Sequence, residues 1–249
     1  MRFPRLRSRN KDSESGEMYF NVSYGRRKEK VSDVQLTGIF DRIGHKYGYS
    51  SAYAGFENFG DMKVTWERSA KLIDFRISDY LDHAPDEVLE DLAECLYTRI
   101  DGGEREASPA FVKYVTDPKF SRTARKTYLE RSVGLSETGE RFDLRNSLDR
   151  LKKEGLVPQD IDLAIRWQHE VTQKASGCSV LMRVVWVNKM LDSRDVPFYV
   201  LDYCIYCAIC GILVGYKAKE EDKQLWKLRR LYPKRREAED WLFEHEMFI

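Results

Sequence analysis

Three of the five cysteines are spaced three residues apart within one apolar segment, residues 196–216. They are Cys204, Cys207 and Cys210, and Cys178 lies upstream of them. Thiolates at such spacing, completed by a more distant ligand such as Cys178, hold iron–sulfur clusters, and thiolates also bind zinc. The neighbouring residues are Tyr, Ile and Leu rather than the glycines and polar residues of a loop around a cluster. Buried cysteines commonly pack as small apolar side chains, so packing is the first interpretation and a Cys-ligated metal or iron–sulfur cluster is the alternative.

The segment that carries these thiols is the longest apolar run of the chain, and as a helix it is long enough to span a bilayer. However, Asp202 lies inside it and Pro197 lies near its start. A charge near the centre of a bilayer costs at least about 2.5 kcal/mol. A helix that is buried on all sides in a protein core has the same composition. We therefore expect a buried core helix and no membrane partner.

Capping residues and hydrophobic spacing predict the other elements. Ser32 is a candidate N-cap for a helix that continues to about Lys46, and Asp82 with Pro85 marks the start of a helix that ends before Gly102. Residues 47–60 are rich in Gly, Ser and aromatic residues and are expected to form a loop. The remaining expectations are strands at 18–23, 62–66, 71–77, 163–167 and 180–187 and helices at 110–115, 118–131, 143–154, 220–231 and 234–243.

Two halves of the chain resemble each other. Met62-Lys-Val-Thr-Trp66 is similar to Met182-Arg-Val-Val-Trp186, and Ala84-Pro-Asp-Glu-Val-Leu-Glu90 is similar to Val196-Pro-Phe-Tyr-Val-Leu-Asp202. Counted on from each proline, Cys95 falls opposite Cys207, and the long period indicates a duplicated unit rather than a solenoid. We therefore expect a helix-rich α+β fold in which each unit has a small sheet, a long core helix and shorter helices after it. The expected divisions are a basic N-terminal arm (1–30), a first unit (31–135), a linker helix (136–160) and a second unit (161–249).

Three segments of the second half follow one further pattern. They are Met182-Arg-Val-Val-Trp-Val-Asn188, Leu191-Asp-Ser-Arg-Asp-Val-Pro-Phe-Tyr-Val-Leu-Asp-Tyr-Cys-Ile-Tyr206 and Arg230-Leu-Tyr-Pro-Lys-Arg-Arg-Glu-Ala-Glu-Asp-Trp-Leu242. In these segments the chain resembles the YgjP/SprT-like predicted metal-dependent hydrolases, a zincin-type family, and the first unit resembles them more faintly. The resemblance implies two zincin-like units, each with a helix on which a His-Glu-x-x-His motif would bind zinc and activate a water molecule.

The chain departs from that family at the residues that carry the chemistry. The resemblance aligns the motif with Cys207-Ala-Ile-Cys-Gly211, so Ala208 replaces the catalytic Glu and Gly211 replaces the second His. The family's third ligand would fall near Asp222, and in the first unit Glu94 is the one carboxylate near a catalytic position. Losing the base and two ligands removes water activation and metal affinity. We therefore expect no enzymatic activity and no cofactor, with zinc or an iron–sulfur cluster as alternatives.

Charge is balanced over the whole chain but clustered along it. The net charge is +1 although 33% of the residues are charged, so no overall field steers the chain toward nucleic acid. Basic residues gather in residues 1–30 and again in residues 217–236, where Trp226 and Tyr232 lie among them. Surfaces that combine basic and aromatic side chains bind nucleic acids. The candidate residues for binding nucleic acid or another partner are Arg2, Arg5, Arg7, Arg9, Arg26, Arg27, Lys28, Arg229, Arg230 and Arg235.

The odd number of cysteines and the absence of an apolar segment near the N-terminus do not fit a secreted protein with a disulfide framework. A cytoplasmic protein with reduced thiols is expected. The sequence therefore predicts a non-catalytic pseudo-metallohydrolase that acts as a binding or scaffold subunit of a cytoplasmic assembly with a protein partner. The alternatives are a Cys-ligated metal or iron–sulfur protein and a nucleic-acid- or ribosome-associated protein.

Overall fold

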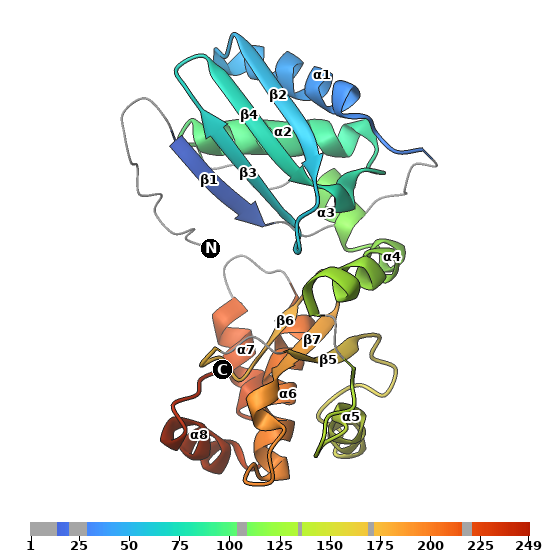
Figure 1. Ribbon diagram of the computed structural model, residues 1–249, viewed down its shortest axis with the longest axis vertical. Coiled ribbons are helices and arrows are strands. Elements are labelled where there is room, and N and C mark those ends of the chain that lie inside the picture. Colours follow the sequence, from blue (N-terminus) through green and yellow to red (C-terminus); the bar gives the residue numbers. More distant parts are fainter. Residues whose placement is uncertain (1–13, 20–28, 104–108, 134–135, 169–171, 216–220) are drawn as a thin grey trace. The chain divides into compact units, whose positions relative to one another are not determined.

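The computed structural model describes residues 14–19, 29–103, 109–133, 136–168, 172–215 and 221–249. The protein has a helix-rich α+β fold with two small sheets (Figure 1). It divides into two compact units, whose boundary in the sequence falls between Ala124 and Arg125. We call residues 2–124 the N-terminal unit and residues 125–249 the C-terminal unit, and each is described by itself.

The N-terminal unit contains one mixed sheet and the helices on its face. Its elements are β1 (Glu14–Tyr19), α1 (Asp33–Gly44), β2 (Ser51–Glu57), β3 (Lys63–Arg68), β4 (Leu72–Ser78), α2 (Asp86–Ile100) and α3 (Pro109–Val115), with 3₁₀ turns at His45–Tyr47 and Asp79–Leu81. The strand order is β1-β3-β4-β2, in which β2 is parallel to β4 and the other pairs are antiparallel. Helices α1 and α2 lie on the same face of this sheet (Figure 1).

Local signals explain where the two long helices of this unit begin. Ser32 and Gln35 form a capping box, because the Ser32 hydroxyl accepts from the Gln35 N–H at 3.2 Å and the Gln35 side chain accepts from the Ser32 N–H at 3.1 Å. Helix α2 begins after Pro85, as expected. The expected cap by Asp82 is wrong, because the Asp82 carboxylate pairs instead with Lys30 at 2.6 Å.

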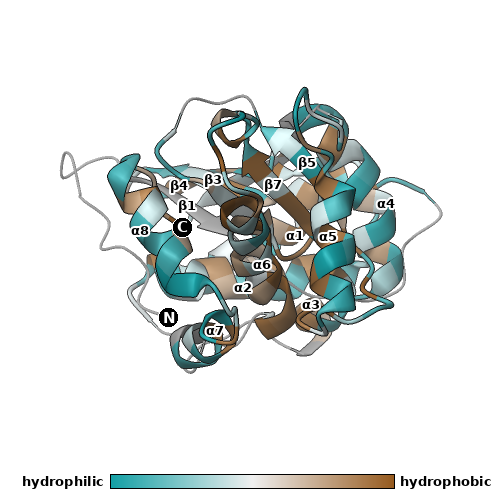
Figure 2. Cartoon of the chain, turned by 90° about the horizontal axis from the view of Figure 1, so that it is seen from below, coloured by the Kyte–Doolittle hydropathy of each residue, from teal (hydrophilic) through white to brown (hydrophobic). Residues whose placement is uncertain are grey.

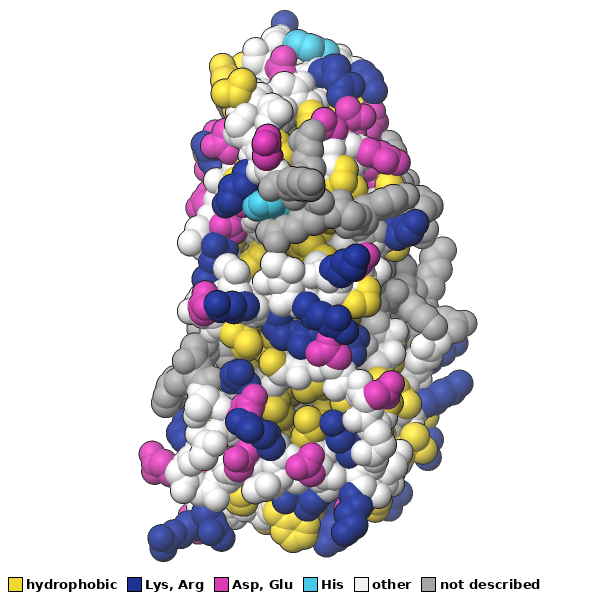
Figure 3. All heavy atoms as spheres, turned by 90° about the vertical axis from the view of Figure 1, so that its right-hand side faces the viewer, with side chains coloured by type: hydrophobic (Ala, Val, Ile, Leu, Met, Phe, Trp, Pro, Cys, Tyr) yellow, Lys and Arg dark blue, Asp and Glu magenta, His cyan; other side chains and the backbone are white. Residues whose placement is uncertain are grey.

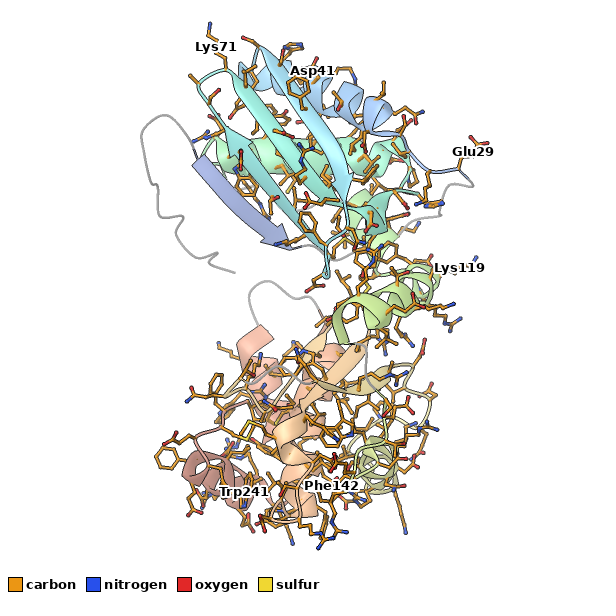
Figure 4. All side chains as sticks on the ribbon, viewed as in Figure 1. Glu29, Asp41, Lys71, Lys119, Phe142 and Trp241 are labelled. Atoms are coloured by element: carbon orange, nitrogen blue, oxygen red, sulfur yellow. The ribbon has the colours of Figure 1, made fainter. Side chains whose placement is uncertain are left out.

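The expected loop at 47–60 is wrong, because it contains strand β2. Ala52 and Ala54 of this strand are buried against α1. The Asp41 carboxylate of α1 accepts from the Ala52 N–H at 2.7 Å (Figure 4), and the Thr37 hydroxyl donates to the Ala54 carbonyl at 2.8 Å. Small residues let the helix approach the strand closely, but they carry little of the β-branched signal by which a strand is predicted.

The C-terminal unit is built around one apolar helix. Its elements are a π-helical turn at Leu129–Val133, α5 (Leu144–Lys153), β5 (Ala164–Gln168), β6 (Ser176–Ser179), β7 (Val184–Asn188), a 3₁₀ turn at Lys189–Leu191, α6 (Phe198–Val214), α7 (Glu221–Arg229) and α8 (Arg235–Glu244). Helix α4 (Pro118–Tyr128) crosses the boundary between the units in the sequence. The strand order is β5-β7-β6, with β5 parallel and β6 antiparallel to β7.

Helix α6 confirms the expected core helix. From Val200 to Cys210, every residue is at most 5% exposed. The helix packs against β6, β7, α5, α7 and α8. In Figure 2 its ribbon is largely brown or white, whereas teal is prominent in α8. Among the residues that the structure describes, no helix is long and apolar enough to cross a membrane.

The strand expected at 180–187 is shorter, and the neighbouring strand β6 was not expected. Residues 180–183 form a turn in which Arg183 has a φ of +52°, so β7 begins at Val184. In β6, Gly177 lies so close to the Trp186 ring that a Cβ atom would overlap it. Glycine allows this close approach, and it also weakens the sequence signal for a strand.

The two units share an order of elements and a pattern of strand pairing. Each has a helix, three strands, a 3₁₀ turn and a long helix, and in each the first strand pairs in parallel with the third while the second pairs with it antiparallel. Pro85 and Pro197 occupy the N-caps of α2 and α6. The predicted match of 62–66 with 182–186 pairs β3 with β7. The topology instead relates β4 to β7, so the predicted match is wrong by one strand.

Helix α5, in the segment expected to link two units, packs within the C-terminal unit. Its Arg150 guanidinium donates two hydrogen bonds to the Asp202 carboxylate of α6, at 2.7 and 2.8 Å. In the N-terminal unit, Arg42 of α1 and Glu90 of α2 form the corresponding ion pair at 2.6 Å. Residues 136–160 therefore complete a unit, and the boundary falls earlier in the chain than the expected one.

Candidate functional site

The three thiols of α6 that were candidate metal ligands are buried in the core of the C-terminal unit. Cys204, Cys207 and Cys210 are each at most 1% exposed, and none forms a disulfide. Burial raises the pKa of Cys207 to about 12 and that of Cys210 to about 11, although the charge of Arg229 acts in the opposite direction. Burial also raises the pKa of Cys204 well above its usual value. Since the thiolate is the metal ligand and the nucleophile, the folded chain holds these groups in their unreactive form.

Cys178 fills the space beside the C-terminal half of α6. Its Sγ atom lies 2.8 Å from the position that a Cβ on Gly211 would take. A side chain at position 211 would therefore have to displace Cys178 or the strand that carries it. Strand β6 is also held to α6 by the Ser176 hydroxyl, which donates to the Cys204 carbonyl at 2.7 Å.

The two candidate carboxylates lie in different units. Glu94 of α2 forms an ion pair with Lys46 at 2.7 Å and accepts from the Tyr47 hydroxyl at 3.0 Å, so it ties α2 to the end of α1. Asp222 lies in the first turn of α7, and its side chain is outside the described part of the structure. Within the described residues, no group of three His, Cys, Asp or Glu side chains is placed to hold a metal ion.

A pocket of about 270 Å³ opens between α6, α7, α8 and the residues that follow α8. We call it the arginine–aromatic pocket. Its polar lining consists of Tyr203, Arg229, Arg230, Arg235 and Glu239. Its apolar lining consists of Trp226, Leu242, Phe243, Met247, Phe248 and Ile249. The structure thus brings together the three basic residues that the sequence had singled out near the C-terminus.

Helical spacing explains why these side chains meet. On α8, Arg235, Glu239 and Leu242 follow one another at i, i+4 and i+7, which places them on one face. On α7, Trp226 and Arg229 are three residues apart and also share a face. The chain then turns back after α8, where Glu246 has a φ of +55°, and this turn returns the last residues of the chain to the pocket.

On one side of the pocket, the charges of Arg235 and Glu239 neutralise each other. Glu239 accepts from the Tyr203 hydroxyl at 2.6 Å and from the Arg235 guanidinium at 2.7 and 2.9 Å. Burial raises the pKa of Tyr203 far above its usual value, and the hydrogen bond to the Glu239 carboxylate adds to the effect. Tyr203 therefore stays protonated and serves as a hydrogen-bond donor.

The other side of the pocket offers positive charge. The Nε atom of Arg229 is buried and has no hydrogen-bond partner. The Arg230 guanidinium lies over the Trp226 ring, 4.4 Å from its centre. Among the described residues, no carboxylate forms an ion pair with Arg229 or Arg230. This side can therefore receive an anionic group from another molecule.

The remaining basic candidates lie elsewhere. Arg2, Arg5, Arg7, Arg9, Arg26, Arg27 and Lys28 are outside the described residues. On the face shown in Figure 3, basic and acidic side chains are interspersed, in agreement with the net charge of +1.

Sequence reasoning missed Tyr203, Phe243, Phe248 and Glu239 as parts of the pocket. One local signal could have indicated Glu239, namely its i, i+4 spacing from Arg235. The other three residues reach the pocket through contacts between elements that are distant in the sequence, and no local pattern predicts such contacts.

Comparison with known proteins gives no relative from which a function could be transferred. No protein-family model, no curated protein and no solved structure matches the chain. The function is therefore argued from the residues and their geometry.

Proposed function

We propose that the protein is a non-catalytic pseudo-metallohydrolase made of two zincin-like units, and that it acts as a binding or scaffold subunit of a cytoplasmic assembly. The resemblance of residues 182–242 to the YgjP/SprT-like hydrolases supports the first part. The observation that supports the proposal is that a Cβ on Gly211 would lie 2.8 Å from the Cys178 Sγ atom, which leaves no room for a ligand at the position that the resemblance assigns to one.

The residues at the aligned positions do not fit a zinc hydrolase centre. A catalytic zinc ion needs three protein ligands and an open position for water. Cys207 offers one buried thiol, Gly211 offers no donor atom, and the space for a side chain at 211 holds the Cys178 sulfur. Ala208 cannot take a proton from water. Helix α6 therefore lies in the core without the residues needed for zinc-dependent hydrolysis, and we assign the protein a binding role instead.

Hydrolase assays with added zinc test this proposal. We expect no zinc-dependent hydrolysis of casein or of ester probes, and no effect of Glu94→Gln or Asp222→Asn on the background rate. The matched control is Glu87→Gln, which removes an exposed carboxylate from the same helix as Glu94. Zinc-dependent turnover that both candidate substitutions abolish and the control retains would refute the proposal.

One observation favours the alternative of a metal held by the cysteines. The Cys178 sulfur lies against Gly211, and its charge when ionised would raise the pKa of Cys210, so the two thiols are neighbours. A thiolate site would have to overcome the burial that keeps the α6 thiols protonated. Iron and zinc analysis of protein purified without oxygen distinguishes this alternative from the proposed function.

A further inference from the structure

The arginine–aromatic pocket is rimmed by apolar side chains that remain in contact with water. Trp226 is 57% exposed, Phe243 is 84% exposed and Phe248 is 55% exposed, and all three line the pocket. Aromatic side chains gathered around a concavity mark a surface on which another molecule packs. The volume of about 270 Å³ lies just below the roughly 300–1,000 Å³ of small-molecule sites. It therefore suits one large side chain better than a whole cofactor.

Two positively charged side chains, those of Arg229 and Arg230, line the pocket beside this apolar rim. Arg229 has a buried Nε–H donor without an acceptor, and Arg230 is held against Trp226. The Arg229 Nε–H itself is closed to solvent, but the Arg229 side chain lines the pocket together with that of Arg230, so the two guanidinium groups can receive a ligand there. Carboxylate oxygens make short, strong hydrogen bonds with guanidinium groups. A ligand that carries a carboxylate next to an apolar group would match both parts of the pocket.

The charges around the pocket disfavour a polyanion. Arg235 is already paired with Glu239, so Arg229 and Arg230 are the lining cations that remain for a ligand. The exposed residues of α8 and its start carry both signs of charge, with Lys234 and Arg236 beside Glu237 and Asp240. Nucleic acids carry a phosphate at every nucleotide and bind along a basic groove, which this mixed surface does not provide. A single acidic residue flanked by apolar residues needs only the two arginines.

We infer that the arginine–aromatic pocket binds a short segment of a partner protein that presents a large apolar side chain next to an acidic one. The apolar side chain packs against Leu242 and Met247, and the carboxylate binds Arg229 and Arg230. This inference rests on the proposed binding role and deepens it by naming the chemistry of the partner. Trp, Tyr and Arg dominate the binding energy of protein interfaces, and the lining of this pocket contains all three.

The test begins with selection of short random peptides, displayed on phage, on the full-length chain. We expect enrichment of peptides in which Asp or Glu neighbours Phe, Leu or Trp. The enriched peptide is then synthesised with a fluorescent label, and its affinity is measured by anisotropy. Arg229→Gln, Arg230→Gln and Trp226→Ala should each weaken binding about tenfold or more. Replacing the acidic residue of the peptide by its amide should weaken binding to the same degree.

Matched controls separate the pocket from general surface effects. Arg236→Gln removes an exposed basic residue and Leu231→Ala removes an apolar residue that is 62% exposed, and neither residue lines the pocket. Both variants should bind the peptide as the unmodified chain does. If Arg229→Gln impairs folding, as judged by circular dichroism, Arg230→Gln decides the question because Arg230 is exposed.

Several results would overturn the inference. These are selection without enrichment, enrichment of peptides without the acidic–apolar pair, and binding that the three pocket variants leave unchanged. Binding of single-stranded oligothymidine with the same dependence on Arg229 and Trp226 would also overturn it, in favour of a nucleic acid. None of these results involves metal or hydrolysis, so failure here is distinguishable from failure of the proposed function.

Discussion

Asp202 is a buried carboxylate in the second turn of the apolar helix α6, and its charge is compensated by Arg150 of another helix. Its side chain is 5% exposed, and the Arg150 guanidinium binds both of its oxygens. The same contact raises the pKa of Arg150 further, mainly through the hydrogen bond with Asp202. The charge of Asp202 argued against a membrane span in the sequence. In the structure, the same carboxylate joins α6 to α5 through Arg150.

Removing this carboxylate should destabilise the C-terminal unit. Asp202→Ala leaves the Arg150 charge without its partner, and because Arg150 is partly exposed we expect a loss of about 2 kcal/mol rather than the full cost of a buried pair. The measurement is the free energy of unfolding from urea titration. Asp149→Ala, an exposed carboxylate on α5, should change it by less than about 0.5 kcal/mol. Equal effects of the two substitutions would contradict this assignment.

The contact between Gly211 and Cys178 can be tested by a double-mutant cycle. Alanine favours a helix interior over glycine by about 1 kcal/mol, but here its Cβ would meet the Cys178 sulfur. Gly211→Ala should therefore be more favourable in a Cys178→Ala background than in the unmodified chain, by about 1 kcal/mol or more. Additive free energies of unfolding would show that the sulfur does not fill this space.

Asp192 provides a prediction about pH. Burial raises its pKa, but the Lys189 ammonium and the backbone N–H groups of Glu140, Phe142 and Arg141 lower it more, so the pKa lies below the usual 3.8. A depressed pKa contributes stability above the pKa of the unfolded chain, and this stability is lost as pH falls through the folded value.

Asp192→Asn should therefore cost about 2–4 kcal/mol at neutral pH. The difference from the unmodified chain should begin to narrow as the pH falls below the usual 3.8, where the unfolded chain takes up the proton first, and it should continue to narrow as the pH falls through the lower pKa of the folded state. The free energy of unfolding of both chains is measured by urea titration at several pH values. Asp195→Asn, which changes an exposed carboxylate, is the control. A difference that does not depend on pH would contradict this account.

At the scale of elements, α6 should shield its thiols from reagents. Its three cysteines are buried and protonated, Cys95 is also buried, and Cys178 is half-buried. At pH 8 a thiol-disulfide reagent should titrate at most one cysteine of the folded chain rapidly, and all five after denaturation. Cys178→Ser should abolish the rapid phase. Rapid reaction of three or more thiols in the folded chain would contradict the assignment of α6 as core.

The elements that could be predicted are those with strong local signals. The candidate N-cap Ser32 and the proline before α2 marked the starts of α1 and α2 correctly, and the long apolar run marked α6. Strands β2 and β6 could not be predicted, because they are rich in Ala, Gly and Ser and are held by partners elsewhere in the chain. Their stability comes from packing against a helix rather than from propensity.

At the scale of the whole molecule, the sequence similarity between the halves corresponds to a shared topology within each unit. The alignment of the long helices agrees with where they begin, since Pro85 and Pro197 occupy the N-caps of α2 and α6. The strands were aligned one strand out of step, because similar pentapeptides, residues 62–66 and 182–186, overlap β3 and β7. Short apolar repeats specify a strand, but the order of strands depends on pairing that the local sequence does not encode.

The candidate site was predictable only in part for the same reason. The basic character of Arg229, Arg230 and Arg235 was evident from the sequence. Their convergence with Tyr203 depends on the packing of α7 and α8 against α6. The glycine at position 211 was visible in the sequence, whereas the Cys178 sulfur that lies beside it could be identified only from the fold.

Metal content is the measurement that tests the central claim most directly. The chain is purified without oxygen and without chelators, and its zinc and iron are measured by mass spectrometry beside an ultraviolet–visible spectrum. A pseudo-hydrolase with a filled ligand position should be colourless and contain well under one equivalent of either metal. One equivalent of zinc or iron that disappears in Cys207→Ser, while the exposed Asp240→Asn control retains it, would contradict the account.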